Sequence, residues 1–491
     1  MIKFNRATMR DKVHACWLGK NLGGTIGGPY EGRTNMNDIK GFVTKPGEVL
    51  PNDDLDLQLL WLKVMEERGP RGINAQVLGE YWLSFIGPNW NEYGIAKANL
   101  RSGIPAPLSG GVNNGHWYHS NGAWIRTEIW SCLYPGNVEE AIRYAFYDAS
   151  VDHGYGEGSY AAIFVAALES AAFVFSDINV LIDIGLSKIP ADCRVARSVN
   201  IAREAYRSGK TWQEARQLIV EDSADLGWFQ APGNLGFVII GLLYGEGDFK
   251  QSMILTVNCG DDTDCTAATV GSILGIIGGT AGLPADWVSY MGEEIVQKCL
   301  VFGHGPYPTS ITQLTDAVMK LQAVTLHVPF FSAFHDYRYS VIIHDEENDF
   351  SEVTPETYYG TNFVDRNFTG SEYTLSTAST FMEVTVAFDE KPTISPEGTL
   401  SGTITVYPRV SIDFQHCHVK WYLPEGWTAS GDKNLFHFRH HNHTGERALG
   451  LHKASFTINA GANVEALNHV VLEIQLPGRS ESALTAFNIL G

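Results

Sequence analysis

The spacing of apolar residues changes near residues 325–336, and this change constrains the fold more than any other feature of the chain. Upstream, apolar residues recur at helical spacing and convincing strands are almost absent. Downstream, the apolar runs are short, β-branched and alternating, and Gly, Pro, Asn and Asp separate them. We therefore predict a multidomain protein, with an all-α domain over residues 1–325 followed by an antiparallel β-sandwich over residues 335–491.

Individual elements follow from the same patterns. Helices are expected at 11–28, 55–64, 138–147, 159–175, 195–208, 212–221 and 234–244, and strands at 339–344, 381–388, 403–407, 410–414, 417–423, 454–458 and 470–476. The Gly- and Pro-rich stretch 94–119 is expected to be a long ordered loop of the kind that often carries function. His437, His440, His441 and His443 lie among Arg and Asn, and a solvated loop is favoured there over a metal site.

Length, charge and cysteine content narrow the class of protein. At 491 residues the chain exceeds what one hydrophobic core usually serves. The net charge is −20, and no Lys/Arg-rich run is visible, which argues against nucleic acid and anionic membranes as partners. Seven cysteines without CxxC pairing and a first ten residues without an apolar run favour a cytoplasmic protein. The uncharged stretch 266–283 is predicted to be a buried helix, not a membrane span.

A cluster of carboxylates stands directly in front of that uncharged stretch. Asp261, Asp262 and Asp264 lie within the segment 258–268. Carboxylate oxygens suit Mg²⁺, Mn²⁺ or Ca²⁺, and acids also suit the positive end of a helix dipole. The cluster is therefore either a metal site or an acidic helix cap without a metal.

A second acidic helix start favours the metal site. Asn52, Asp53, Asp54 and Asp56 open another apolar-periodic run about 200 residues upstream. Two such starts can share one metal site if the fold brings them together.

A glycine-rich helix and a loop carboxylate complete the pattern. Glycines recur at three- and four-residue steps in 11–28, which predicts a helix face that another backbone can approach closely. The helix ends at Pro29, and Glu31 follows in a loop. Glu31 is either a proton-transferring acid or a surface carboxylate.

Taken together, these features resemble the ADP-ribosylglycohydrolase family, which includes the dinitrogenase-reductase-activating glycohydrolases. The resemblance covers roughly residues 11–290. The family's late Gly-Asp-x-Asp-Thr/Ser signature is matched at Asp262 to Cys265, and its early Thr-Asp-Asp-Thr signature at Asn52 to Leu55. Its middle Gly-Asn-Gly-Ala-x-x-Arg signature is matched at 120–126, and His153 falls where the family often has Thr-His.

The resemblance implies a fold, a cofactor and roles for particular residues. It implies an orthogonal helical bundle with a magnesium site of one or two ions, for which Mn²⁺ or Ca²⁺ are alternatives. The implied metal ligands are Asn52, Asp53, Asp54, Asp262 and Asp264. The implied catalytic residue is Glu31, and the implied substrate-binding residues are Asn121, Gly122 and His153.

Three positions depart from the family pattern. Cys265 replaces a Thr or Ser, and a thiol is a poor Mg²⁺ ligand, so a second metal is weak, absent or bound through Thr266 instead. Gly24 stands where the family commonly has Asp, and Leu55 where it has a second Thr. All of these changes fall at the site, which suggests an altered substrate more than a lost fold.

The expected function is metal-dependent hydrolysis of an N- or O-glycosidic bond at a ribose-like sugar, with de-ADP-ribosylation as the leading case. The substrate would be a small molecule or a sugar attached to a protein. Few basic residues lie near the motifs beyond Arg33, Arg101 and Arg126, so a non-phosphorylated glycoside is a rival substrate. A non-catalytic protein that binds ADP-ribose or carbohydrate is a rival of another class. The oligomeric state stays open.

Overall fold

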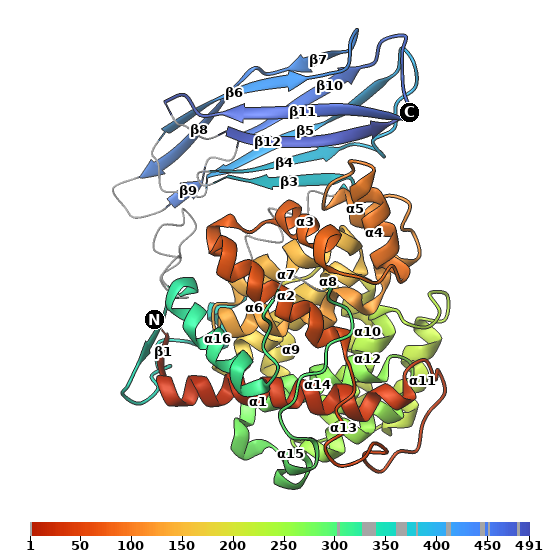
Figure 1. Ribbon diagram of the computed structural model, residues 1–491, viewed down its shortest axis with the longest axis vertical. Coiled ribbons are helices and arrows are strands. Elements are labelled where there is room, and N and C mark those ends of the chain that lie inside the picture. Colours follow the sequence, from red (N-terminus) through yellow and green to blue (C-terminus); the bar gives the residue numbers. More distant parts are fainter. Residues whose placement is uncertain are drawn as a thin grey trace.

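The computed structural model divides into a helical part and a β part (Figure 1). It describes residues 2–301, 305–326, 340–359, 371–379, 382–408, 414–441, 447–449, 452–478 and 482–491. The helical part runs from α1 (Arg6–Gly27) to α16 (Ile311–Thr325), and the sandwich strands follow from β3 (Thr374–Ala378). The predicted fold class, a helical bundle followed by antiparallel sheets, is confirmed.

Every predicted helical segment overlaps a helix of the structure. Besides α1 and α16, the helices used below are α2 (Asp53–Arg68), α3 (Ala75–Phe85), α4 (Asn91–Arg101), α5 (Leu108–Gly111), α7 (Val138–His153), α8 (Glu157–Ala172), α10 (Arg194–Arg207), α11 (Trp212–Asp222), α12 (Ala231–Tyr244) and α14 (Thr263–Gly278). Of these, α3, α4, α5 and α16 were not predicted. Within the described part of the chain, no helix is both long and apolar enough to cross a lipid bilayer.

Helices α1 and α14 pack with their backbones almost in contact. A Cβ added at Gly19 would lie 2.0 Å from the carbonyl oxygen of Gly271, and one at Gly23 would lie 2.3 Å from the backbone nitrogen of Ala268. Only glycine leaves room for such an approach. The close helix contact predicted from the glycine spacing is confirmed, and it brings the end of α1 to the start of α14.

Gly23→Ala is expected to destabilise the protein by about 3 kcal/mol, since the new methyl group overlaps backbone atoms that cannot rotate away. Gly278→Ala is the matched control, because a Cβ there would meet nothing within 4 Å. Alanine is also the better helix former, so this control should be neutral or slightly stabilising. Urea unfolding of both variants measures the difference, and equal stabilities would contradict the close packing.

The β part is a sandwich of two five-stranded sheets. The sheet orders are β3-β4-β5-β10-β7 and β12-β11-β6-β8-β9, and the pairs within each are antiparallel. Val384 and Ile404 from the first sheet share one apolar core with Leu472 and Phe487 from the second. The remaining strands are β4 (Met382–Phe388), β5 (Thr399–Pro408), β6 (Phe414–Tyr422), β7 (Thr428–Gly431), β8 (Asn434–His441), β9 (Arg447–Leu449), β10 (His452–Asn459), β11 (Leu467–Gln475) and β12 (Ser482–Leu490).

Residues just after the predicted boundary belong with the helices. Strand β2 (Val341–His344) pairs in parallel with β1 (Ile2–Asn5) at the amino end of the chain. Val341 and Tyr358 are part of the helical core. The division at 325 and 335 stays a prediction, and this packing favours a sandwich that starts after residue 358.

Two sequence expectations were wrong in detail. The stretch 94–119 contains most of α4 and all of α5, because apolar residues such as Ile104 and Leu108 are buried against the sandwich core. The histidines at 437, 440 and 441 lie in strand β8, where a loop was expected, and His443 lies outside the described residues. Four of the five residues of the strand expected at 410–414 also lie outside them.

Helix α4 joins the sandwich to the site described below. At its carboxyl end, the backbone N–H of Asn488 in β12 donates to the carbonyl oxygen of Gly103 at 2.7 Å, and the Asn488 amide donates to Ser102 at 2.8 Å. At its amino end lie Trp90, Glu92 and the residues that follow.

Candidate active site

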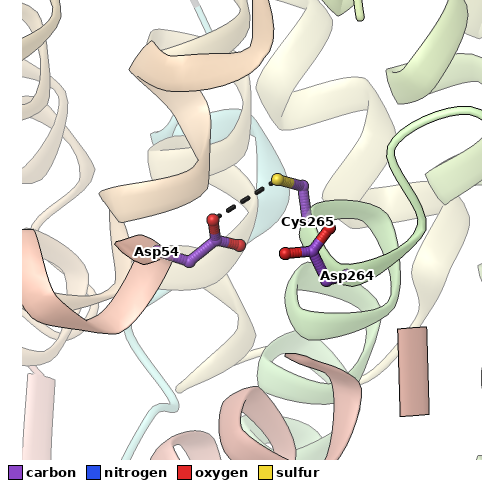
Figure 2. Close-up of side chains that lie close together, drawn as sticks. All are labelled: Asp54, Asp264 and Cys265. Atoms are coloured by element: carbon purple, nitrogen blue, oxygen red, sulfur yellow. Dashed lines mark hydrogen bonds between the residues drawn. The ribbon is translucent and has the colours of Figure 1, made fainter. Parts of the chain in front are cut away.

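The two acidic helix starts meet in space. Oxygen atoms of Glu31, Asp262 and Asp264 lie within 4.8 Å of one another, and so do ligand atoms of Asp54, Asp264 and Cys265. Figure 2 shows Asp54 on one helix facing Asp264 and Cys265 on another. The structure thus brings together the carboxylates of Glu31, Asp54, Asp262 and Asp264.

Local hydrogen bonds hold these residues in place. The side-chain oxygen of Asn52 accepts from the backbone N–H of Asp54 at 2.8 Å, which caps α2. The loop after Glu31 is tied to the loop before α14, because Asp261 N–H donates to the carbonyl oxygen of Arg33 at 2.7 Å and Gly32 N–H donates to that of Asp261 at 2.9 Å. Glu31 is thereby brought to the start of α14.

The change at Gly24 is explained by Asn52. A Cβ at Gly24 would lie 2.0 Å from the amide nitrogen of Asn52. Asn52 is larger than the Thr of the family signature, and it occupies space that a side chain at residue 24 would need. These two departures from the family pattern are therefore complementary in volume.

The buried carboxylates have unused oxygens. One oxygen each of Asp262 and Asp264 is buried without a hydrogen-bond partner in the described part of the chain. The other Asp262 oxygen accepts from the amide of Asn121 at 2.7 Å. Burial, then the neighbouring Asp264 and Asp54, raise the pKa of Asp262. Carboxylate oxygens that lack a partner and lie in one cluster fit a divalent cation, because such ions prefer oxygen ligands.

Cys265 and Lys20 both bind Asp54. The Cys265 thiol donates to one oxygen of Asp54 at 3.3 Å, and the Lys20 ammonium lies 3.5 Å from the other. The same ammonium lies 2.9 Å from Glu128, and all three charged groups are buried. Burial, with Asp262 and Asp54, raises the pKa of the Cys265 thiol, so the thiol is neutral. The Thr266 hydroxyl donates to the Asp262 carbonyl oxygen at 2.9 Å, so it is already hydrogen-bonded to the backbone.

A cleft of about 350 Å³ opens above the carboxylates. It is lined by Glu31, Asp53, Trp90, Asn91, Glu92, Tyr93, Gly122, Ile125, Trp228, Phe229, Asp264, Cys265 and Lys298. Glu31 lies at its mouth, and the charge of Asp264, burial and Asp53 raise the pKa of Glu31 to about 7. A carboxyl group with a pKa near neutrality can both take up and release a proton.

The predicted substrate-binding residues do not all reach the cleft. Gly122 lines it, and Asn121 lies beneath, where it binds Asp262. His153 is fully buried and is not part of the cleft lining. Its Nε2 lies 2.9 Å from the Ser120 hydroxyl oxygen, and its Nδ1 lies 2.9 Å from Asp152.

Three residues of the site were not predicted from the sequence. Lys20 had a usable signal, since it is a lone charge between apolar residues of a glycine-rich helix. Glu92 and Lys298 had none, because they lie in segments without a motif. Asp56 positions Lys298 by accepting the backbone N–H groups of Lys298 and Cys299 at 2.6 and 2.7 Å.

Comparison with known proteins identifies the family. Residues 5–325 match the family model described as ADP-ribosylglycohydrolase. The chain belongs to the ADP-ribosylglycohydrolase family. Membership supports a glycohydrolase activity on a sugar-containing substrate, and members of this family generally depend on a metal.

Two solved structures are similar to parts of the chain. An ADP-ribosylglycohydrolase-related protein complex is 18% identical, with a TM-score of 0.43, and the match covers 65% of this chain and 99% of that one. A FixG-related protein from Vibrio parahaemolyticus is 8% identical, with a TM-score of 0.18, over 22% of this chain and 94% of that one. No curated protein matches the sequence.

Proposed function

We propose that this ADP-ribosylglycohydrolase family member is a metal-dependent hydrolase that cleaves an N- or O-glycosidic bond at a ribose-like sugar. The observation that carries the proposal is the convergence of Glu31, Asp262 and Asp264 within 4.8 Å at a cleft. Asp53, Asp54, Asp262 and Asp264 would hold the cation, with Asn52 as a supporting residue. Mg²⁺ is the first candidate ion, and Mn²⁺ and Ca²⁺ share its preference for oxygen.

The roles of the residues follow from their positions. A bound divalent cation supplies Lewis-acid charge that polarises oxygen atoms near it. Glu31 takes a proton from the attacking water and passes it to the leaving group, which its raised pKa and its place at the mouth allow. Asn121 holds Asp262 in orientation. Gly122 leaves room for Glu92 and Tyr93 beside the cleft, since a Cβ there would lie 2.3 Å from Oε1 of Glu92.

Glu31→Gln tests the proposed acid-base role. The substitution keeps the size of the side chain but removes the exchangeable proton, so kcat is expected to fall about 10²- to 10⁴-fold while cation binding persists. The assay is release of free sugar, detected by mass spectrometry, from ADP-ribosylated peptides, ADP-ribose esters and synthetic glycosides with Mg²⁺. Wild-type protein that releases no sugar from any of these would instead support a binding protein.

The cation should stabilise the fold more at neutral pH than at acidic pH. The carboxyls of Asp54, Asp262 and Asp264 have raised pKa values when folded, and that of Glu31 is about 7. Their contribution to stability is therefore complete below the unfolded value of about 4 and is lost as pH rises through the folded values. A cation offsets the charges that appear in this window.

The measurement is the Tm with and without Mg²⁺ between about pH 4.5 and 7.5. We expect the gain in Tm from Mg²⁺ to grow as pH rises through this range. A gain that is the same at both ends would contradict the shared metal site.

Two substrate classes remain for this reaction. The family name favours an ADP-ribosyl group. A glycoside without phosphate is the alternative, because Lys298 is the one cationic side chain among the described residues that line the cleft.

A further inference from the structure

Two neighbouring carboxylates at the start of α14 have unused oxygen atoms. Oδ1 of Asp262 and Oδ1 of Asp264 are buried, and neither has a hydrogen-bond partner among the described residues. Both residues are more than nine-tenths buried, and oxygen atoms of both lie within 4.8 Å of one another and of Glu31. A buried carboxylate oxygen is costly unless a donor or a cation binds it. These atoms therefore mark a place for one divalent cation.

The second group of possible metal ligands differs, because two of its members bind each other. It consists of Asp54, Asp264 and Cys265. The Cys265 thiol donates to Oδ1 of Asp54 at 3.3 Å (Figure 2), and a thiol is a poor ligand for Mg²⁺. The neighbouring Thr266 hydroxyl is bonded to a backbone carbonyl oxygen. A second ion would therefore find few oxygen atoms that are free to bind it.

Lys20 places a positive charge beside the other oxygen of Asp54. Its ammonium lies 3.5 Å from Oδ2 of Asp54 and 2.9 Å from Oε1 of Glu128, and it donates to the carbonyl oxygen of Ile125 at 2.5 Å. Lys20, Asp54 and Glu128 are all fully buried, so water screens their charges only weakly. Both oxygens of Asp54 thus have partners within the protein, one neutral and one cationic.

We propose that the site holds a single divalent cation, at Asp262 and Asp264, and that Lys20 supplies at Asp54 the positive charge that a second ion would bring. This inference rests on the proposed function, and it refines that function by assigning the number of ions. A second ion at Asp54 would be separated from the Lys20 ammonium by one carboxyl group. Like charges at such a distance in a buried site repel each other strongly.

The experiment counts the Mn²⁺ ions that the full-length protein binds. Mn²⁺ shares the preference of Mg²⁺ for oxygen ligands, and its sharp EPR signal in solution is lost when the ion binds to a protein. Titration of the wild type is expected to show about one ion per chain beyond those bound by Asp262→Asn. That variant is the control, because it keeps the acidic surface and loses the proposed site.

Two variants test the part played by Lys20. Cys265→Ser adds a hydroxyl ligand of similar size and keeps the ammonium, so it should still bind about one ion. Lys20→Met combined with Cys265→Ser also removes the ammonium and should bind about two ions. Metal ions that share a site lie about 3.5–4 Å apart, so the EPR spectrum of the double variant should show two magnetically coupled ions.

Each outcome decides the question. About two ions in the wild type would overturn the inference and leave the proposed function standing, whereas no bound ion would contradict the metal-dependent function itself. About two ions in Cys265→Ser would show that Lys20 does not exclude the second ion, and this result is decisive even if the double variant does not fold. A folded double variant that binds about one ion would also overturn the role of Lys20.

Discussion

Asp262→Asn is expected to lower kcat/KM by about 100- to 1000-fold or more and to abolish the gain in Tm from Mg²⁺. A bound metal supplies several kcal/mol of transition-state stabilisation, and each 1.36 kcal/mol is tenfold in rate. Asp262 is fully buried, and one of its oxygens has no partner in the described structure. An amide at this position cannot supply the negative charge that holds the cation.

The fold should survive this substitution. An asparagine oxygen can still accept from Asn121, which is the 2.7 Å bond that orients the wild-type carboxylate. Burial raises the pKa of Asp262, so a neutral amide should leave the Tm without Mg²⁺ equal or higher. Asp38→Asn, at an exposed carboxylate, is the control. Full activity of Asp262→Asn would exclude the proposed metal site.

Lys20→Met is expected to lower the free energy of unfolding by about 3–5 kcal/mol. The Lys20 ammonium is fully buried between Asp54 and Glu128, and its removal leaves two carboxyl groups without a counter-charge. Although burial by itself lowers the pKa of Lys20, Glu128 and Asp54 outweigh it and raise the pKa above its ordinary value. Urea unfolding without added cation measures the loss.

The double variant Lys20→Met with Glu128→Gln separates charge from packing. It removes one of the two carboxylates that Lys20→Met leaves without a counter-charge. At least about 1 kcal/mol of the lost free energy of unfolding should be recovered, because the effects of substitutions within one ion-pair network are not additive. The amide oxygen that Glu128→Gln introduces can still accept from Gln58, which donates to the Glu128 carboxylate at 2.7 Å. Lys40→Met at an exposed pair should change stability by less than about 0.5 kcal/mol. A loss below about 1 kcal/mol for Lys20→Met would show that the buried lysine is not a counter-charge.

Local sequence patterns were enough to predict most elements of the fold. Carboxylates before apolar-periodic runs mark the starts of α2 and α14, because caps and dipoles act within one helix turn. Glycines at four-residue steps predicted the close packing of α1. The stretch 94–119 was mistaken for a loop because its apolar residues have their partners in the sandwich, more than 250 residues away.

By itself, the sequence determined the helical and β parts, the acidic helix starts and the family signatures, since each depends on residues close together in the chain. The tertiary structure alone decided which side chains surround the cleft. Asn121 meets Asp262 across 141 positions, and Lys20 meets Asp54 across 34. It also buried Arg126 between Asp148 and Asp152. Such pairings depend on how helices pack, and no local pattern carries that information.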